Sequence, residues 1–452
     1  NAGKKLHWVF AMFSIVATET SVLTFISIPS LGYKKSFFFL QLALGFIIGR
    51  IFVSYFLLPL YFKSNIISIY EVLSSGNNKA LQKIASLIFL ITRILADGIR
   101  FLATGTIIKI LTGWSIEFSI IALGIITLIY TISGGLKAVL VVDSLQFIIY
   151  FAGGLVSIIY IFYNSDISFM NEISKFDFSF IFKTSTENYF YDPWYFLNAI
   201  MGGIILSFAS HGVDYLMVQR VLSTNNLSNA RKAMIGSGFF VFLQFSIFLS
   251  LGYLISLYMQ DCSFIEKDQE LSTFILLHLP NGLKGLLFAG VLSASMSTLS
   301  SSINSLASST VADWIGKDVS VYVSRLVSFF WAIVLISVSL LFNNSSESFV
   351  ILGLKIASFT YGGLLVLFLL NKYIYKIHQW SIINGLLGGL LIVLLSSFNQ
   401  IAWTWFILLN IVFSFLFILF SEFFLNILFK KIFSFIIMVI IISSVFSNKI
   451  QP

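Results

Sequence analysis

Residues 292–304 carry an unusual density of side-chain oxygens within an apolar stretch. These side chains are Ser293, Ser295, Ser297, Thr298, Ser300, Ser301, Ser302 and Asn304. Three- and four-residue spacing places some of them on one helix face. The members of that face are Ser297, Ser300, Ser301 and Asn304, with Thr298 beside them. Hydroxyl oxygens are hard ligands that suit small hard cations, so the pattern indicates a site for dehydrated Na⁺. The alternative is close helix packing, which enriches small polar residues without any ion.

A carboxylate in the first apolar segment is a second candidate. Glu19 lies at mid-segment among hydroxyl side chains that include Ser21 and Thr24. An ionisable residue inside a spanning helix is costly and indicates a functional site. Hydroxyl side chains can bond their own backbone and loosen the helical ladder, which frees carbonyls to coordinate a cation. The alternative is a buried Glu19 that is hydrogen-bonded for packing alone.

Three charged residues share one face of the third apolar segment. Arg93, Asp97 and Arg100 are four and three residues apart, so a helix brings them together. Asp97 can pair with both arginines and lower the cost of burying them. Either the three form a structural triad, or one arginine keeps a free edge for an anionic or polyhydroxyl solute. Gln41, in an otherwise apolar run, is open to two interpretations, substrate contact or packing.

Further acidic residues follow small residues in two other segments. Asp143 lies about one turn into an apolar segment after Gly134 and Gly135. It can ligate a cation or be satisfied by the backbone at a helix start. His211 and Asp214 are three residues apart and can pair. We interpret this pair as structural or gating residues rather than as direct substrate contacts.

Five separated motifs, in order along the chain, resemble the sodium:solute symporter family. They are Leu58-Pro59-Leu60-Tyr61 with Tyr70-Glu71, Gly134-Gly135 with Asp143 and Gln146, His211-Gly212-Val213-Asp214 with Gln219-Arg220, residues 280–290, and residues 294–304 with Asp313. The family includes sodium-coupled sugar, sialic acid, proline and iodide carriers. The resemblance covers residues 1–371 and is to a bacterial-type member. It implies an all-α integral membrane protein with an inverted five-plus-five helix repeat, the leucine-transporter-like fold.

The resemblance also implies roles for particular residues. The Na⁺ site would be formed by Ala17, Thr20, Ala294, Ser297 and Thr298, the first three through their carbonyls. A second Na⁺ site would be formed by Asp143, Ser297, Ser300 and Ser301. Glu19, Ser21 and Thr24 would face the substrate. Together with the candidates taken from the residues alone, the expected substrate contacts are Glu19, Ser21, Thr24, Gln41, Arg93, Asp97 and Arg100.

The composition agrees with a membrane protein. The chain has 452 residues, of which 58% are hydrophobic and 10% charged. A soluble globular chain is about one-quarter charged. The net charge of +8 gathers in short loops rather than in a nucleic-acid-binding surface. One cysteine excludes an internal disulfide and a cysteine-based metal cluster. No nucleophile–base pair, metal-binding motif or phosphate-binding loop stands out, so the sequence does not indicate an enzyme.

Thirteen apolar segments are long enough to cross a bilayer. They are 8–29, 37–61, 84–112, 115–133, 139–163, 194–219, 234–258, 271–306, 320–343, 348–371, 380–397, 403–421 and 430–447. The first ten form two halves, about 8–163 and 194–371, and residues 372–452 add three C-terminal helices. An odd number of spans per half gives the halves opposite orientations. The extra N-terminal helix of the family is expected to be missing.

Lysine and arginine fall in alternate loops, which predicts that the first segment starts in the cytoplasm. The expected location is the plasma (inner) membrane, with the lipid bilayer and a small solute as partners, no nucleic acid, and a functional monomer. The predicted function is sodium-coupled secondary active import of a small polar solute by alternating access. The alternative is a sodium-binding sensor or channel without concentrative uptake.

Overall fold

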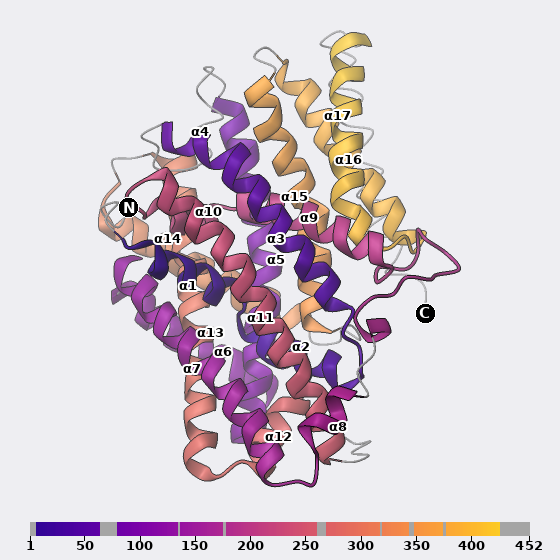
Figure 1. Ribbon diagram of the computed structural model, residues 1–452. Coiled ribbons are helices and arrows are strands. Elements are labelled where there is room, and N and C mark those ends of the chain that lie inside the picture. The colour runs from indigo at the N-terminus through magenta and orange to yellow at the C-terminus, as the bar shows by residue number, and fades with distance from the viewer. Residues whose placement is uncertain are drawn as a thin grey trace, which may run out of the picture.

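The computed structural model describes residues 6–63, 79–133, 136–174, 178–259, 268–316, 319–342, 348–373 and 377–424. Within these ranges the chain is a bundle of long helices, with the N-terminal end beside α10 (Figure 1). Eight described helices are long and apolar enough to cross a membrane, and ten spans result if each of two bent helix pairs counts as one. Twelve of the thirteen expected segments coincide with described helices, and 430–447 lies outside the described residues.

The elements follow one another in the expected order. Residues before 175 form α1 (Trp8–Glu19), α2 (Val22–Tyr33), α3 (Phe39–Phe52), the π-helical turn η1 (Val53–Leu57), α4 (Leu58–Lys63), α5 (Lys79–Thr112), α6 (Ile116–Ser133), α7 (Leu136–Tyr163) and α8 (Phe169–Ser174). A short 3₁₀ turn η3 (Phe178–Phe180) precedes α9 (Phe196–Val213), α10 (Tyr215–Leu222), α11 (Leu227–Met259), α12 (Glu270–His278), α13 (Asn281–Thr310), the π turn η4 (Val311–Ile315), α14 (Val321–Leu341) and α15 (Phe349–Tyr373). The described chain ends with α16 (Gln379–Phe398), η5 (Trp403–Trp405) and α17 (Phe406–Phe424).

The first span is broken near its middle. Helices α1 and α2 meet at an angle of 63° across Thr20 and Ser21. Thr20 ends α1 with φ −87° and ψ 61°, and Ser21 begins α2 in an extended conformation. The hydroxyls of Thr18 and Thr20 donate to the carbonyls of Ser14 and Val16. Such side-chain bonds compete with the backbone hydrogen bonds of the helix. This is the local reason that the helix is interrupted in this hydroxyl-rich sequence.

A second interruption separates α9 from α10. Asp214, between them, has φ −79° and ψ 121°, and its Oδ1 accepts a hydrogen bond from Leu216 N at 2.8 Å. The side chain therefore caps the new helix α10 while the backbone turns away from α9. The helical backbone is therefore interrupted here, as it is between α1 and α2.

Glycines bring α3 and α9 into close contact. A Cβ on Gly45 would stand 2.4 Å from the carbonyl oxygen of Ile200, and one on Gly203 would stand 2.2 Å from that of Leu42. Ser207 Oγ donates to Phe46 O at 3.0 Å in the same contact. Small residues allow such close approach of membrane helices. The contact places residues 200–208 of α9 beside residues 42–49 of α3.

The expected single segment 271–306 is instead two helices. Helix α12 ends at His278, and α13 begins after Leu279 and Pro280. Leu279 is extended, with ψ 148°, as is usual for a residue that precedes proline. A proline has no backbone N–H and is tolerated at a helix start, so α13 begins at this point and continues past residue 306.

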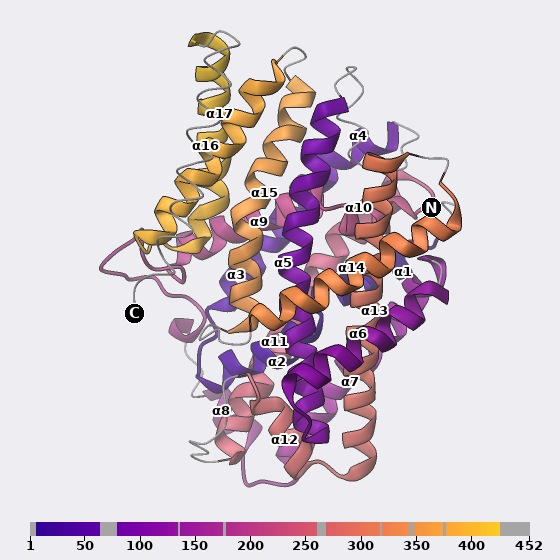
Figure 2. The same ribbon diagram turned by 180° about the vertical axis from the view of Figure 1, so that it is seen from behind.

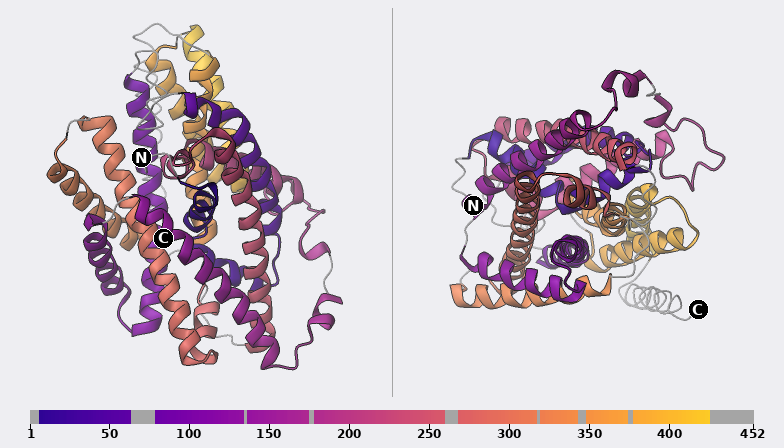
Figure 3. Two further views of the ribbon diagram at one scale, coloured as in Figure 1. Left: turned by 60° about the vertical axis from the view of Figure 1, so that its left-hand side comes forward. Right: turned by 90° about the horizontal axis from the view of Figure 1, so that it is seen from below.

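The remaining helices enclose the broken ones. Seen from behind, α14 crosses α5 and α13, and the three are in contact (Figure 2). Helices α16 and α17 pack on each other and on α15, at one edge of the bundle, where they are yellow in Figure 3. Helix α17 also contacts α9. These last helices therefore support the elements next to the broken spans without adding residues to the cavity described below.

Candidate functional site

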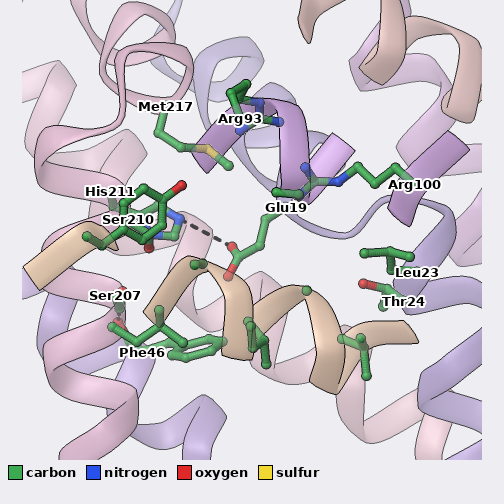
Figure 4. Close-up of a pocket in the computed structure, with 17 residues that line it drawn as sticks. Glu19, Leu23, Thr24, Phe46, Arg93, Arg100, Ser207, Ser210, His211 and Met217 are labelled. Atoms are coloured by element: carbon green, nitrogen blue, oxygen red, sulfur yellow. Dashed lines mark hydrogen bonds and ion pairs between the residues drawn. The ribbon is translucent and has the colours of Figure 1, made fainter. Parts of the chain in front are cut away.

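A cavity of about 100 Å³ lies beside the break in the first span. Its polar and charged lining residues come from α1, α2, α5, α9 and α15, and Figure 4 shows how several of these side chains converge. The polar and charged lining residues are Glu19, Thr24, Arg93, Arg100, Ser207, Ser210, His211 and Tyr361. The apolar lining residues come mainly from α2, α9 and α15, and they include Leu23, Leu206, Val350, Leu354 and Ala357. The cavity thus suits a small solute with one polar end and one apolar side.

Glu19 is the centre of one ion-pair group, which we call the Glu19 group (Glu19, Arg50 and His211). Arg50 of α3 is fully buried, and its Nη2 donates to Glu19 Oε2 while its Nη1 donates to Ser237 Oγ at 2.6 Å. His211 Nε2 lies 3.4 Å from the same carboxylate oxygen, the contact drawn as a dashed line in Figure 4. The negative charge at the helix break is therefore matched by an arginine that lies outside the cavity lining.

A second ion-pair group, the Arg93 group, comprises Arg93, Asp97, Arg100 and Asp214. Arg93 donates to both Asp97 oxygens, at 2.6 and 2.9 Å, and to Asp214 Oδ2 at 3.3 Å. Asp97 also accepts from Arg100 Nη1. The pairing of Asp97 with both arginines, expected from their spacing, is confirmed. Asp97 itself is fully buried and is not among the cavity-lining residues.

Arg100 keeps one edge of its guanidinium free. Its Nε donates to Ser21 Oγ at 3.3 Å and its Nη1 to Asp97, whereas its Nη2 makes no hydrogen bond to any residue that the structure describes. The side chain is 14% exposed, compared with 3% for Arg93. Because Arg100 lines the cavity, the free Nη2 is available to a bound ligand. A guanidinium edge binds planar anions such as carboxylates well.

The expected Na⁺ ligands lie on two elements. Backbone bonding stops at Thr20 N, which donates to Val16 O at 2.8 Å, and resumes where Ser21 O accepts from Thr24 N at 3.0 Å. The carbonyls of Ala17 and Thr20 fall in this interval. On α13, Thr298 and Ser300 are buried. Oxygens of the type that binds Na⁺ therefore occur both at the break between α1 and α2 and on α13.

Other expected ion ligands are less fully described. The side chains of Asp143, Ala294 and Ser297 lie outside the described set, although their backbones belong to α7 and α13. Ser301 Oγ accepts from Arg220 Nη2 at 3.4 Å, and Arg220 Nε donates to Ser14 Oγ at 3.1 Å. Arg220, fully buried, thus joins α1 to α13. Both Na⁺ sites stay predictions.

Gln41 lies away from the cavity. Its Nε2 donates to Phe38 O at 3.3 Å and to Trp194 O at 3.0 Å, and its Oε1 accepts from Lys183 N at 3.3 Å. These bonds attach the segment before α9 to α3. In the same segment Lys183 Nζ lies 2.7 Å from the Asp192 carboxylate. Partial burial acts to raise the pKa of Asp192, but the bonds from Lys183 and Trp194 N outweigh it and lower the pKa.

His211 and Asp214 belong to different groups rather than to one pair. His211 lies next to Glu19, with its Nδ1 3.0 Å from Ser210 Oγ, and it lines the cavity. Asp214 binds Arg93 and accepts from Tyr361 OH at 2.5 Å. Asp214 therefore holds α5, α10 and α15 together, in keeping with the expected structural role. Glu19, Thr24, Arg93 and Arg100 all meet at the cavity, and Ser21 reaches it through Arg100.

Three buried residues with clear contacts were not among the expected site residues: Arg50, Arg220 and Tyr361. Of these, the sequence motifs include only Arg220. An arginine in the middle of an apolar segment was the available signal for Arg50, because such a residue needs a buried partner. Tyr361 gave no signal in the sequence, since tyrosine is common in membrane segments.

The sequence pattern of the sodium:solute symporter family matches residues 1–389. The chain belongs to the sodium:solute symporter family. The expected family is thus confirmed, and the match extends beyond residue 371 into α16. Like its relatives named below, the family consists of transporters rather than enzymes.

Several curated relatives cover most of the chain. A putative sodium-dependent multivitamin transporter of Drosophila melanogaster is 28% identical over 88% of this chain and 68% of its own length. The sodium-dependent multivitamin transporter of Oryctolagus cuniculus is 27% identical over 86% of this chain and 64% of its own. The sodium/sialic acid symporter NanT of Aliivibrio fischeri is 24% identical over 69% of this chain and 63% of its own. The chain spans about two-thirds of the length of these relatives.

Solved structures confirm the fold. A Na⁺-coupled sialic acid symporter in a substrate-bound, outward-open state superimposes with a TM-score of 0.80 at 20% identity, over 94% of this chain and 91% of its own. Mhp1, a nucleobase-cation-symport-1 family transporter, gives 0.60 at 11% identity, over 96% of this chain and 98% of its own. The expected all-helical, leucine-transporter-like fold is therefore confirmed, and the protein is a multi-pass membrane protein.

Proposed function

We propose that the protein is a sodium-coupled symporter that imports a small monoanionic solute. The observation that supports this most directly is the free guanidinium edge of Arg100 in a cavity that is also lined by several apolar side chains. Family membership makes Na⁺ the coupling ion. The relatives named above are themselves sodium-dependent carriers, which favours transport over a sensor or channel.

Charge balance supports an anionic solute. The Glu19 group and the Arg93 group together contain three arginines and three carboxylates, so they are neutral as a set when His211 is neutral. The expected Na⁺ ligands Ala17, Thr20, Ala294, Ser297 and Thr298 are also neutral. A bound Na⁺ would then leave the region with one uncompensated positive charge. At a separation of ~8 Å and an effective dielectric constant of ~20, a monoanion would recover roughly 2 kcal/mol of this cost.

The apolar wall limits the solute further. A neutral, highly hydroxylated sugar would leave hydroxyls against Leu23, Val350 and Leu354, where no partner is at hand. A carboxylate with an aliphatic or aromatic body matches both walls. Thr24, Ser207 and Ser210 supply further hydrogen-bonding groups near the polar end.

We further propose the organisation that goes with this activity. Residues 8–163 and 194–371 form the two inverted repeats, each starting with a broken span, and the later helices are supporting elements. The protein acts as a monomer in the plasma (inner) membrane, with the start of α1 in the cytoplasm. The membrane potential then drives Na⁺ inward with about 2.3 kcal/mol per charge per 100 mV.

The test is the thermal stability of the purified protein in Na⁺ or K⁺ with small carboxylates, zwitterionic amino acids or neutral sugars. A ligand that binds only the folded protein raises its melting temperature. We expect some monocarboxylates to do so only when Na⁺ is present. Arg100→Gln should remove the carboxylate response and keep the response to Na⁺ alone. Lys109→Gln is the matched control, because Lys109 is an exposed cation on the same helix. Stabilisation by a neutral solute in both variants would overturn the assignment of substrate class.

A further inference from the structure

A groove of about 630 Å³ lies on the surface where the start of α11 meets α1 and η1. It is separate from the cavity beside Glu19, with which it shares no lining residue. The residues that carry the argument are Trp8, Met12, Arg231, Lys232, Ile235 and Phe239. The groove is near the N-terminal end of α1, beside α10 in Figure 1.

The cations of this groove have no acidic partner among the described residues. Arg231 Nε donates to Ser54 O at 3.0 Å, and its guanidinium carbon lies 4.7 Å from the ring centre of Tyr55. The side chain is thus held in place by a carbonyl and a ring, neither of which neutralises its charge. Lys232, next to it, is exposed. No described carboxylate forms a salt bridge with either residue, and no acidic residue lines the groove.

The chemistry of the groove changes along α11. Ser228, Arg231 and Lys232 form its polar end, whereas Ile235 and Phe239, one and two turns further along, form its apolar end. With a rise of about 1.5 Å per residue, the seven residues from Lys232 to Phe239 cover about 10 Å along the helix. A phospholipid has the same order of groups, an anionic headgroup followed by an acyl chain.

Exposed aromatic residues flank the groove. Phe52, Tyr55, Phe56 and Phe239 are 40%, 57%, 48% and 58% exposed. Phe52 lies on α3 directly before η1, and Tyr55 and Phe56 lie within η1. Indole rings such as that of Trp8 favour the boundary between headgroups and acyl chains. Exposed aromatic side chains of this kind suit the boundary between lipid headgroups and acyl chains.

We propose that this groove binds the headgroup of an anionic phospholipid, with its phosphate on Arg231 and Lys232 and an acyl chain along Ile235 and Phe239. Trp8 and Met12 come from α1, the half of the broken span that precedes the break. A lipid bound there contacts α1 and α11 at once. It would thereby favour the arrangement of these two helices seen here over others.

The first test compares phosphatidylglycerol with phosphatidylcholine of identical acyl chains, each added to the detergent-purified protein. We expect phosphatidylglycerol to give the larger rise in melting temperature. Removing one basic residue should weaken the binding of phosphatidylglycerol about fivefold. This fold-change corresponds to about 1 kcal/mol, the contribution of one basic residue near an anionic surface. Glycerol phosphate and inorganic phosphate at the same concentrations should give no rise, which separates a lipid from a free anion.

Lys232→Gln and Arg231→Lys test the two cations separately. Lys232 makes no described contact that its loss would break, so this variant should fold and lose the preference for phosphatidylglycerol. Arg231→Lys keeps the charge and should retain most of that preference. The matched control is Arg325→Gln, which removes an exposed cation from α14. An equal response to both lipids in the unmodified protein, or an unchanged preference in Lys232→Gln, would overturn the proposal.

Trp8 supplies a local measurement. Phosphatidylglycerol with a nitroxide-labelled acyl chain should quench part of the tryptophan fluorescence more strongly than the labelled phosphatidylcholine. The protein has eight tryptophans, so the variant Trp8→Phe identifies the contribution of Trp8. The difference between the two lipids should disappear in this variant. Persistence of the whole difference in Trp8→Phe would place the lipid elsewhere and reject the groove.

Discussion

The pair of Glu19 and Arg50 shows how a single contact positions the proposed site. Arg50 comes from α3, crosses toward the broken span and joins Glu19 to Ser237 of α11. Both groups are charged in a region of low polarity, so each is acceptable only because the other is present. Glu19 is consequently a poor choice for binding a cationic substrate group. Its bond to Arg50 joins the end of α1 to α3 and, through Arg50 and Ser237, to α11.

Replacement of Glu19 by Gln should destabilise the protein strongly. The change leaves the fully buried Arg50 without its carboxylate, and such a loss costs about 3–5 kcal/mol. The measurement is thermal unfolding in detergent. The double variant Glu19→Gln with Arg50→Met should recover much of the stability, because it removes the unpaired charge as well. A single variant as stable as the unmodified protein would show that the pair does not hold the break in place.

Thr298→Ala should weaken Na⁺ binding by about tenfold or more. The variant removes one protein oxygen that would bind the cation, and loss of a polar contact to a charged group costs about 1.5–3 kcal/mol. The readout is the Na⁺ concentration that gives half-maximal uptake or stabilisation. Ser295→Ala is the matched control on the same helix, because Ser295 Oγ already donates to Val291 O at 2.8 Å. The double change of Ser297 and Thr298 to Ala should abolish sodium-dependent uptake. If uptake survives it unchanged, the assigned site is wrong.

At the level of residues, local contacts were predictable and distant ones were not. The pairing of Arg93, Asp97 and Arg100 follows from helical spacing alone. The contact between Glu19 and Arg50 joins positions 31 residues apart, and that between Ser14 and Arg220 joins positions 206 apart. Spacing along one helix carries no information about which other helix will face it. For the same reason the sequence left open whether Gln41 faces a substrate or holds a loop.

At the level of elements, the two broken spans determine which groups can face a ligand. The first break was predictable, because several hydroxyls next to a glutamate are poorly suited to a continuous helix. The second was less so, because Asp214 is a usual helix cap but its bonds to Arg93 and Tyr361 join distant parts of the chain. Pro280 marks the boundary that divides the expected segment 271–306 into α12 and α13. Helix α3 packs closely on α9 and bonds Glu19 through Arg50, so it connects α9 to the first break.

The glycine contact between α3 and α9 can be tested with one added methyl group. In Gly45→Ala the new Cβ would meet the backbone of α9 at 2.4 and 2.8 Å, where no side chain can move aside. We expect a loss of about 1–3 kcal/mol of stability, seen as a lower melting temperature. Gly282→Ala is the control, because a Cβ there meets nothing within 4 Å. It should be neutral or stabilise by up to about 1 kcal/mol, since alanine is the better helix former. Equal effects of both changes would argue against helix spacing as the cause.

At the level of the whole molecule, the proposed function requires that two ligands share one conformational equilibrium. Na⁺ would fix the break between α1 and α2, whose second half provides Leu23 and Thr24 to the cavity. A cation that orders this break lowers the cost of forming the solute site. In addition, the positive charge of Na⁺ is matched by the negative charge of the solute. Both effects make the two binding events mutually favourable.

Thermodynamic linkage turns this into a quantitative prediction. If Na⁺ raises the affinity for the solute by some factor, the solute must raise the affinity for Na⁺ by the same factor, and factors of about 5–150 are typical of coupled sites. Calorimetric titrations of solute at several Na⁺ concentrations, and of Na⁺ at several solute concentrations, measure both factors, with K⁺ as the control ion. Arg100→Gln should reduce both factors together. It removes a contact to the solute and leaves the expected Na⁺ ligands unchanged. A factor of one in the unmodified protein would mean that the ion and the solute bind independently. A sodium gradient could then not drive import, and the alternative of a sodium-binding sensor or channel would become the better description.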